Sequence, residues 1–103
     1  MLLELLTKNG SDLFITSGHA PTLRVNGLLQ PLDMPESTPQ EVESIVRRFV
    51  SEADFERLEE EQDIDYAYEA RLPGFGVRRF RGCAFYQRYG LSIVLRTIPV
   101  QIP

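Results

Sequence analysis

β-Strands are indicated in six segments of the chain, by alternation of apolar and polar residues or by flanking turn signals. In the clearest segment, Ile64, Tyr66 and Tyr68 share one side, while Asp65 and Glu69 face the other. Asn-Gly, the dipeptide most typical of a tight hairpin turn, separates two of the segments. The pattern therefore predicts strands over residues 11–17, 22–26, 28–32, 63–70, 77–87 and 91–98.

Helical spacing appears at the start of the chain and again between the third and fourth predicted strands. Leucines over residues 1–8 predict a short helix that ends at Asn9-Gly10. Thr38 as N-cap, a following proline and Glu41 form a strong start signal, and Ser51 begins a further helix. The longer helix presents one apolar stripe, made of Val42, Ile45, Val46, Phe49 and Val50. The element order predicts an α+β domain with an antiparallel sheet and helices packed on one face.

Length and composition agree with one small folded domain. The chain has 103 residues, of which 43% are hydrophobic and 25% charged, so disorder is disfavoured. We expect neither a membrane span nor a signal peptide, and the single cysteine, Cys83, fits a reducing cytosol. The domain is expected over residues 1–98, and the proline-flanked residues 99–103 resemble the start of a linker to a further domain.

Charge is divided unevenly along the chain. Residues 1–70 carry 5 basic and 15 acidic groups, whereas residues 71–103 carry six arginines and no acid. The net charges are −10 and +6, which together give the total of −4. Two interpretations stay open: the arginines face an anionic partner, or they pair with the acids inside the folded domain. Nucleic acid is a poor candidate for that partner, because the pI is near 4.9 and the chain has one lysine.

Most catalytic constellations are excluded by what the sequence contains. A phosphate-binding (Walker A) loop needs a glycine-rich turn followed by lysine, and the only lysine, Lys8, has no such turn. One histidine, His19, and one cysteine cannot form a zinc site, and His19 is expected in a loop. Asp63 and Asp65 share a strand face, which is more typical of a solvated surface than of a metal site. The chain is therefore not expected to be an enzyme on its own.

Two arginines have a more specific arrangement. If the last hairpin turns through Arg88-Tyr89, Gln87 pairs with Gly90 and Arg81 lies directly opposite Arg96. Like charges in facing positions destabilise a sheet unless an anion joins them or nearby acids neutralise them. Both explanations are open from the pattern alone.

The chain resembles a known family, the PilT/PilU-type ATPases. These are hexameric motors of type IV pilus retraction and twitching motility, related to type II secretion ATPases. The resemblance covers nearly the whole chain in order. The residues that carry it are Gly10-Ser11-Asp12-Leu13-Phe14-Ile15-Thr16-Ser17-Gly18, Pro21, Arg24-Val25-Asn26-Gly27, 63–69, Pro73-Gly74, Arg79-Phe80-Arg81, Ala84-Phe85, Gln87-Arg88 and Leu95-Arg96-Thr97-Ile98-Pro99. Gly82-Cys83 departs from the pattern, because the family more often has Val-Asn there.

The resemblance implies a PAS-like α+β domain followed by a RecA-like catalytic domain. ATP and Mg would be bound between the two domains of the full-length protein, with Arg81 and Arg96 as the cofactor-binding residues that reach the phosphates. The domain would pack against its own and the adjacent subunit's catalytic domain in a homo-hexamer. A platform protein of the inner membrane would be a further partner, and the motor would be cytoplasmic. A stand-alone PAS-like sensor of a small ligand is the alternative, and it would need a polar-lined cavity inside the sheet.

Overall fold

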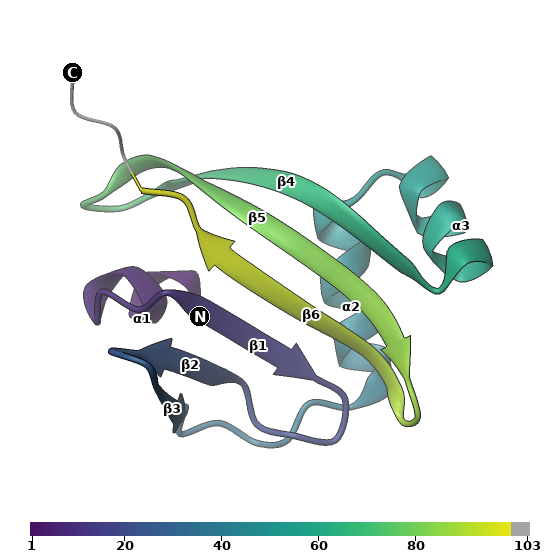
Figure 1. The fold of residues 1–103 in the computed structure, drawn as a ribbon, viewed down its shortest axis with the longest axis horizontal. Helices are drawn as coiled ribbons and strands as arrows, with labels where there is room; N and C mark the ends of the chain where they lie inside the picture. The colour runs from purple at the N-terminus through teal and green to yellow at the C-terminus, as the bar shows by residue number, and fades with distance from the viewer. Residues whose placement is uncertain (100–103) are drawn as a thin grey trace.

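The computed structural model describes residues 1–99, and these residues form the predicted sequence of elements (Figure 1). Most of the expected linker, residues 100–103, lies outside the described residues. The elements are α1 (Leu2–Thr7), β1 (Asp12–Thr16), β2 (Thr22–Val25), β3 (Leu28–Pro31), α2 (Pro39–Phe49), α3 (Glu52–Glu61), β4 (Asp63–Leu72), β5 (Gly76–Gln87) and β6 (Gly90–Thr97). The prediction of an α+β fold is confirmed.

The six strands form one antiparallel sheet in the order β3-β2-β1-β6-β5-β4. The first three strands and the last three are each joined in sequence, and β1 pairs with β6 to connect the two halves. The helices lie on one side of the sheet, and the other side is not covered by any described helix (Figure 1). The prediction of helices on one face is therefore confirmed.

The local signals in the sequence act as expected. Asn26 and Gly27 both have positive φ, 51° and 78°, as the tight turn between β2 and β3 requires. At the start of α2, Thr38 and Glu41 form a complete capping box, each side chain accepting a hydrogen bond from the other residue's backbone N–H. The Ser51 side chain caps α3 in the same way by accepting from the Asp54 N–H.

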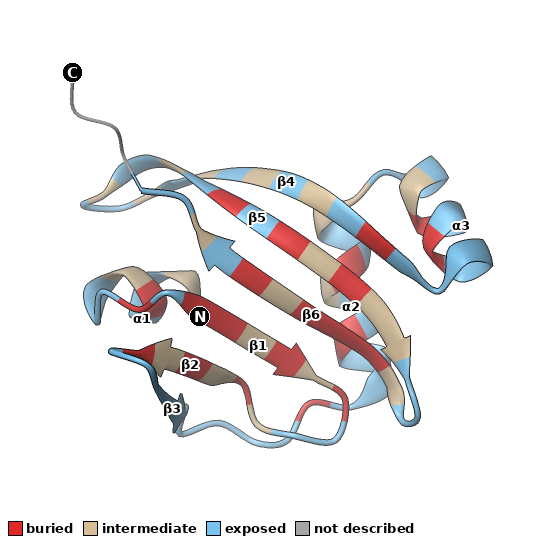
Figure 2. Cartoon of the chain, in the orientation of Figure 1, coloured by how far each residue is buried: buried red, intermediate tan, exposed pale blue. Residues whose placement is uncertain are grey.

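The core lies between the sheet and the helices (Figure 2). It contains alternate residues of the central strands, such as Leu13 and Ile15 of β1 and Ile93 and Leu95 of β6. From the helices it takes residues of the predicted stripe and of α3, namely Val42, Val46, Phe55 and Leu58. The intervening strand residues therefore point to the open side of the sheet. Within residues 1–99, no helix has the length and apolar character needed to cross a bilayer.

One close contact in the core depends on a glycine. Tyr66 of β4 lies opposite Gly82 of β5, and its ring rests against the glycine backbone. A Cβ added at Gly82 would lie 2.5 Å from Tyr66 Cζ. The same ring stacks on Phe49 of α2, with 6.5 Å between ring centroids. Burial raises the pKa of the Tyr66 hydroxyl, which has no hydrogen-bond partner among the described residues.

Candidate functional site

Arg81 and Arg96 lie directly opposite each other on neighbouring strands, as the predicted hairpin register requires. Their neighbours Phe80 and Leu95 point into the core and are fully buried. Alternation along β5 and β6 therefore places both arginines on the open side of the sheet, where no described helix covers them. This pair is the central feature of the candidate site.

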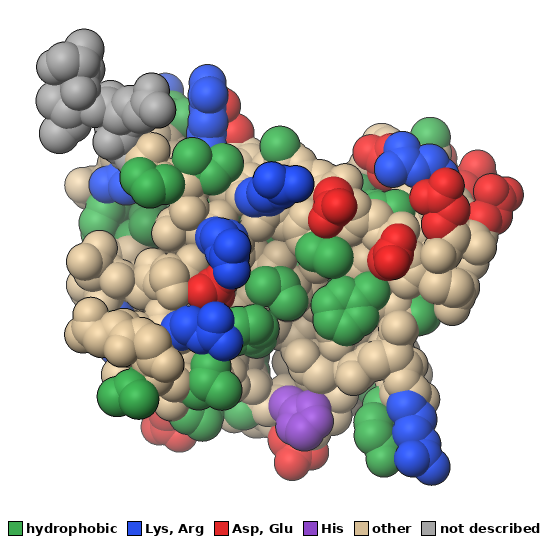
Figure 3. Space-filling view, in the orientation of Figure 1, with side chains coloured by type: hydrophobic (Ala, Val, Ile, Leu, Met, Phe, Trp, Pro, Cys, Tyr) green, Lys and Arg blue, Asp and Glu red, His purple; other side chains and the backbone are tan. Residues whose placement is uncertain are grey.

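The arginine pair is part of a longer row that crosses the whole sheet. Cross-strand pairing places one residue from every strand in line, and in the space-filling view basic side chains and an acidic one follow one another on this face (Figure 3). The members of this arginine row, from β4 to β3, are Ala67, Arg81, Arg96, Asp12, Arg24 and Leu29. Three guanidinium groups and one carboxylate give the row a net charge of +2.

Asp12 is the internal counter-charge of the arginine row. Its side chain is only 3% exposed, and its Oδ1 accepts a 3.1 Å hydrogen bond from Arg96 Nε. The Ser11 hydroxyl donates to Oδ2 at 2.7 Å, and Arg24 Nη1 lies 3.9 Å from the same oxygen. Sequence reasoning did not assign Asp12 or Arg24 to the candidate site, because their alignment with Arg96 depends on the pairing of β1 with β6.

The interpretation that the arginines pair with acids of the domain holds for part of the set. Arg96 pairs with Asp12, and Arg79 pairs with Glu69 at 3.3 Å, so these arginines do meet acids of the domain. Arg81 forms no ion pair with any residue in 1–99. An uncompensated arginine opposite another arginine remains the arrangement that favours an anion.

A shallow groove of about 210 Å³ runs beside the arginine pair on the open face. The arginine row contributes Arg81 and Arg96 to its lining. The next row of paired residues contributes Asp65, Cys83 and Val94, and Gly82 lies between the two rows on β5. The guanidinium groups can donate charge-assisted hydrogen bonds to a phosphate or carboxylate bound there. Within the described range, neither Asp65 nor Asp63 belongs to a cluster of His, Cys, Asp or Glu that could hold a metal ion.

Comparison with known proteins shows that this chain is similar to pilus ATPases. It is 36% identical over 103 residues to the type IV pilus ATPase PilU of Pseudomonas aeruginosa and 32% identical over 102 residues to PilT, the pilus retraction ATPase of the same organism. The crystal structure of the pilus retraction motor PilT with bound ADP superimposes with a TM-score of 0.83 and 32% identity, over 99% of this chain and 29% of that chain. The chain matches the N-terminal portion of the PilT/PilU-type ATPases.

The match covers all of this domain but a minor part of each relative. The chain spans 26% of the length of PilU and 28% of PilT, while 100% and 98% of its own residues are aligned. No family model matches the chain. The fold expected from the PilT/PilU resemblance is confirmed by the superposition, whereas the roles of individual residues are not addressed by it.

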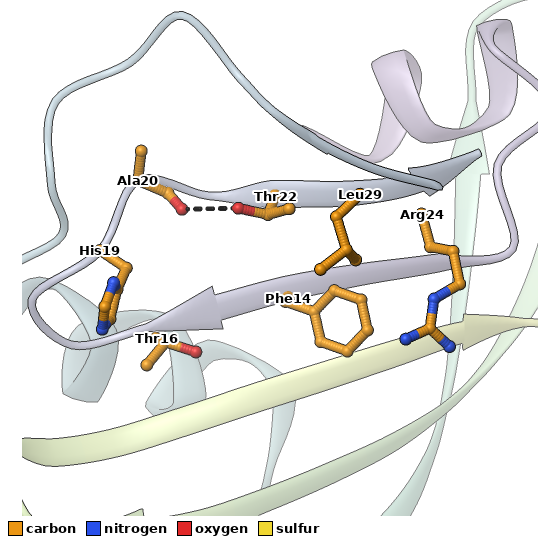
Figure 4. Close-up of a pocket in the computed structure, with 7 residues that line it drawn as sticks. All are labelled: Phe14, Thr16, His19, Ala20, Thr22, Arg24 and Leu29. Carbon is orange, nitrogen blue, oxygen red and sulfur yellow. Dashed lines mark hydrogen bonds between the residues drawn. The ribbon is translucent and has the colours of Figure 1, made fainter. Parts of the chain in front are cut away.

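A second groove of about 340 Å³ lies at the other end of the open face. Figure 4 shows its lining from β1, β2, β3 and the loop between β1 and β2, with Thr22 Oγ1 donating to the Ala20 carbonyl at 3.1 Å. His19 lies in that loop, as predicted, and the Arg24 guanidinium lies 5.3 Å from the centroid of the Phe14 ring. Because its lining belongs to the outer face, this groove is not the internal cavity that a small-ligand sensor would need.

Cys83 lines the first groove as a half-buried free thiol. Burial raises the pKa of the thiol, and the carboxylate of Asp65 raises it further. The thiolate is the reactive form, so the folded domain should keep this sulfur largely unreactive near neutral pH.

We therefore expect Cys83 to react several-fold more slowly with a thiol reagent in the folded domain than in the urea-unfolded domain. The rates would be compared at pH 8 by following absorbance after addition of an aromatic disulfide reagent. In an Asp65→Asn variant the folded-state rate should rise, because a charge that opposes thiolate formation is gone. Equal rates in folded and unfolded protein would contradict the assignment.

Proposed function

We propose that this domain is the N-terminal regulatory and assembly domain of a hexameric type IV pilus retraction ATPase. In this proposal Arg81 and Arg96 contact the phosphates of ATP bound between this domain and a RecA-like domain that follows residues 99–103. The observation that carries the proposal is the facing arginine pair on an uncovered sheet face, with Arg81 free of any ion pair within residues 1–99. The solved PilT relative contains ADP, which supports a nucleotide as the anion.

The rest of the open face supports an assembly role. Phe14 of β1 pairs with Val94 of β6 on the same side as the arginines, and Phe85 of β5, two positions beyond Cys83, the partner of Val94, also lies on that side. A sheet face that mixes apolar and charged groups in this way is suited to packing against another domain. We propose that its own and the adjacent subunit's RecA-like domains cover this face. The platform protein of the inner membrane and a cytoplasmic location belong to the same proposal.

The domain supplies arginines in this proposal and not the whole ATP site. Mg²⁺ and the catalytic groups would come with the RecA-like domain, because the sequence of this domain offers no phosphate-binding loop and no described metal cluster. The guanidinium groups would neutralise phosphate charge as the two domains close on the nucleotide. The deciding experiment is ATP turnover by the full-length protein with Arg81 or Arg96 replaced by Ala.

The isolated domain, residues 1–103, is expected to release no phosphate from ATP. Its one lysine, Lys8, lies outside any glycine-rich turn, so the domain lacks the loop that binds the transferred phosphate. A phosphate-release assay on repurified protein would measure this, with the full-length protein as the positive control. If the isolated domain hydrolyses ATP and its specific activity stays constant through repurification, the proposal that catalysis requires the RecA-like domain is wrong.

A further inference from the structure

Asp12 combines features that are unusual for a residue beside an anion site. Its carboxylate is 3% exposed, although it lies on the open face between two arginines that are 68% and 41% exposed. A buried carboxylate is costly unless its oxygens are paired, and here both oxygens have partners. The site therefore contains a negative charge at the point where a phosphate would be expected to meet only positive ones.

The geometry of the Arg96 contact explains how the negative charge of Asp12 can favour phosphate binding. Arg96 donates its Nε–H to Asp12 Oδ1 at 3.1 Å, which engages the inner edge of the guanidinium. The two terminal nitrogens are then free to donate to a ligand. An arginine side chain as exposed as this one has many rotamers, and fixing it costs conformational entropy. The buried acceptor supplies that fixation before any ligand arrives.

We propose that Asp12 is a positioning residue that holds the Arg96 guanidinium in the orientation that receives phosphate. This inference rests on the proposed function, in which Arg96 contacts the phosphates of ATP. Arg24, on the far side of Asp12 at 3.9 Å, offsets the remaining charge of the carboxylate. The effective anion site is thus the arginine row from Arg81 to Arg24, with one acid built in as a support.

A competing explanation makes the opposite prediction. If Asp12 only offsets excess positive charge, removing it raises the local positive potential and strengthens phosphate binding. If Asp12 positions Arg96, removing it weakens phosphate binding. The sign of the change therefore separates the two explanations.

The test is the KM for ATP of the full-length protein with Asp12→Ala or Asp12→Asn. We expect Asp12→Ala to raise KM about tenfold, since the charge-assisted contact that Arg96 makes loses its alignment. Asp12→Asn keeps an oxygen at the same place to accept from Arg96 Nε, so we expect a rise of only about threefold. Folding of each variant is checked by circular dichroism. If Asp12→Ala does not fold, Asp12→Asn alone still decides, because the competing explanation requires its KM to fall.

Asp65→Asn is the matched control. Asp65 borders the groove that the arginine pair lines, yet it forms no ion pair with Arg81 or Arg96 in the described chain. Removing its charge should lower KM modestly, because nothing that holds an arginine is lost. A fall in KM for Asp12→Ala like that for Asp65→Asn would overturn the positioning role.

Arg96→Ala and the double variant Asp12→Ala/Arg96→Ala separate this inference from the proposed function. If Asp12 acts through Arg96, the double variant has the same KM as Arg96→Ala. If instead the two increases multiply, Asp12 acts elsewhere and the inference is wrong, while the proposed function stands. If Arg96→Ala itself leaves kcat/KM for ATP unchanged, the proposed function is wrong.

Discussion

Replacing Arg81 or Arg96 by Ala in the full-length protein should lower kcat/KM for ATP by about ten- to a hundredfold. A charge-assisted contact to phosphate contributes about 1.5–3 kcal/mol, and each variant removes one such arginine. Stability should change little in Arg81→Ala, because Arg81 has no ion pair within residues 1–99 and faces a like charge. Arg81→Lys should recover only part of the activity, since the planar fork of the guanidinium is lost.

Arg78→Ala is the matched control for these variants. Arg78 is three positions from Arg81 on β5, so alternation places it on the opposite face. Its Nε donates to the Phe75 carbonyl at 3.4 Å, a local contact at the end of the hairpin. Its Ala variant should turn over ATP nearly as fast as the parent protein. Equal damage from Arg78→Ala and Arg81→Ala, or unfolding of the Arg81 and Arg96 variants, would show that these arginines are structural.

Gly82→Val should lower the free energy of unfolding of the domain by about 3 kcal/mol. The new Cβ would lie 2.5 Å from Tyr66 Cζ, so the tyrosine ring must leave its place against the backbone. That movement would also break the stacking on Phe49 and open a gap between β4 and α2. Urea unfolding followed by circular dichroism would measure the loss.

The neighbouring position supplies the control for Gly82→Val. Cys83 points to the open face, and Cys83→Asn places a polar side chain where water reaches, so we expect a change within about 0.5 kcal/mol. Combining Gly82→Val with Tyr66→Ala should reduce the cost of the valine, because the clashing ring is absent. If the domain that keeps Tyr66 tolerates Gly82→Val, this explanation for the glycine is wrong.

The local elements could be predicted because their signals lie within a few residues. Asn26-Gly27 set the register of β2 and β3, and the turn through Arg88-Tyr89 set that of β5 and β6. From the second of these registers the facing arginines followed directly. Alternation also predicted that Ile64, Tyr66 and Tyr68 share one side of β4, and Ile64 is buried there.

The composition of the arginine row could not be predicted in the same way. Asp12 and Arg96 are 84 positions apart, and only the pairing of β1 with β6 brings them together. A single sequence carries no local signal for which strands become neighbours. The fit of Tyr66 on Gly82 has the same origin, because it depends on the exact pairing of β4 with β5. Glycine in a strand indicates a close approach, but it does not name the partner.

The pairing of β1 with β6 also has a consequence for biosynthesis. During translation, one edge of β1 stays unpaired until β6, the last strand in the sequence, has emerged from the ribosome. Pairing across so long a separation in sequence is slow compared with hairpin formation. Asp12 then meets Arg96 only when the sheet closes, so a nascent chain cannot present the complete arginine row before the whole domain has been translated.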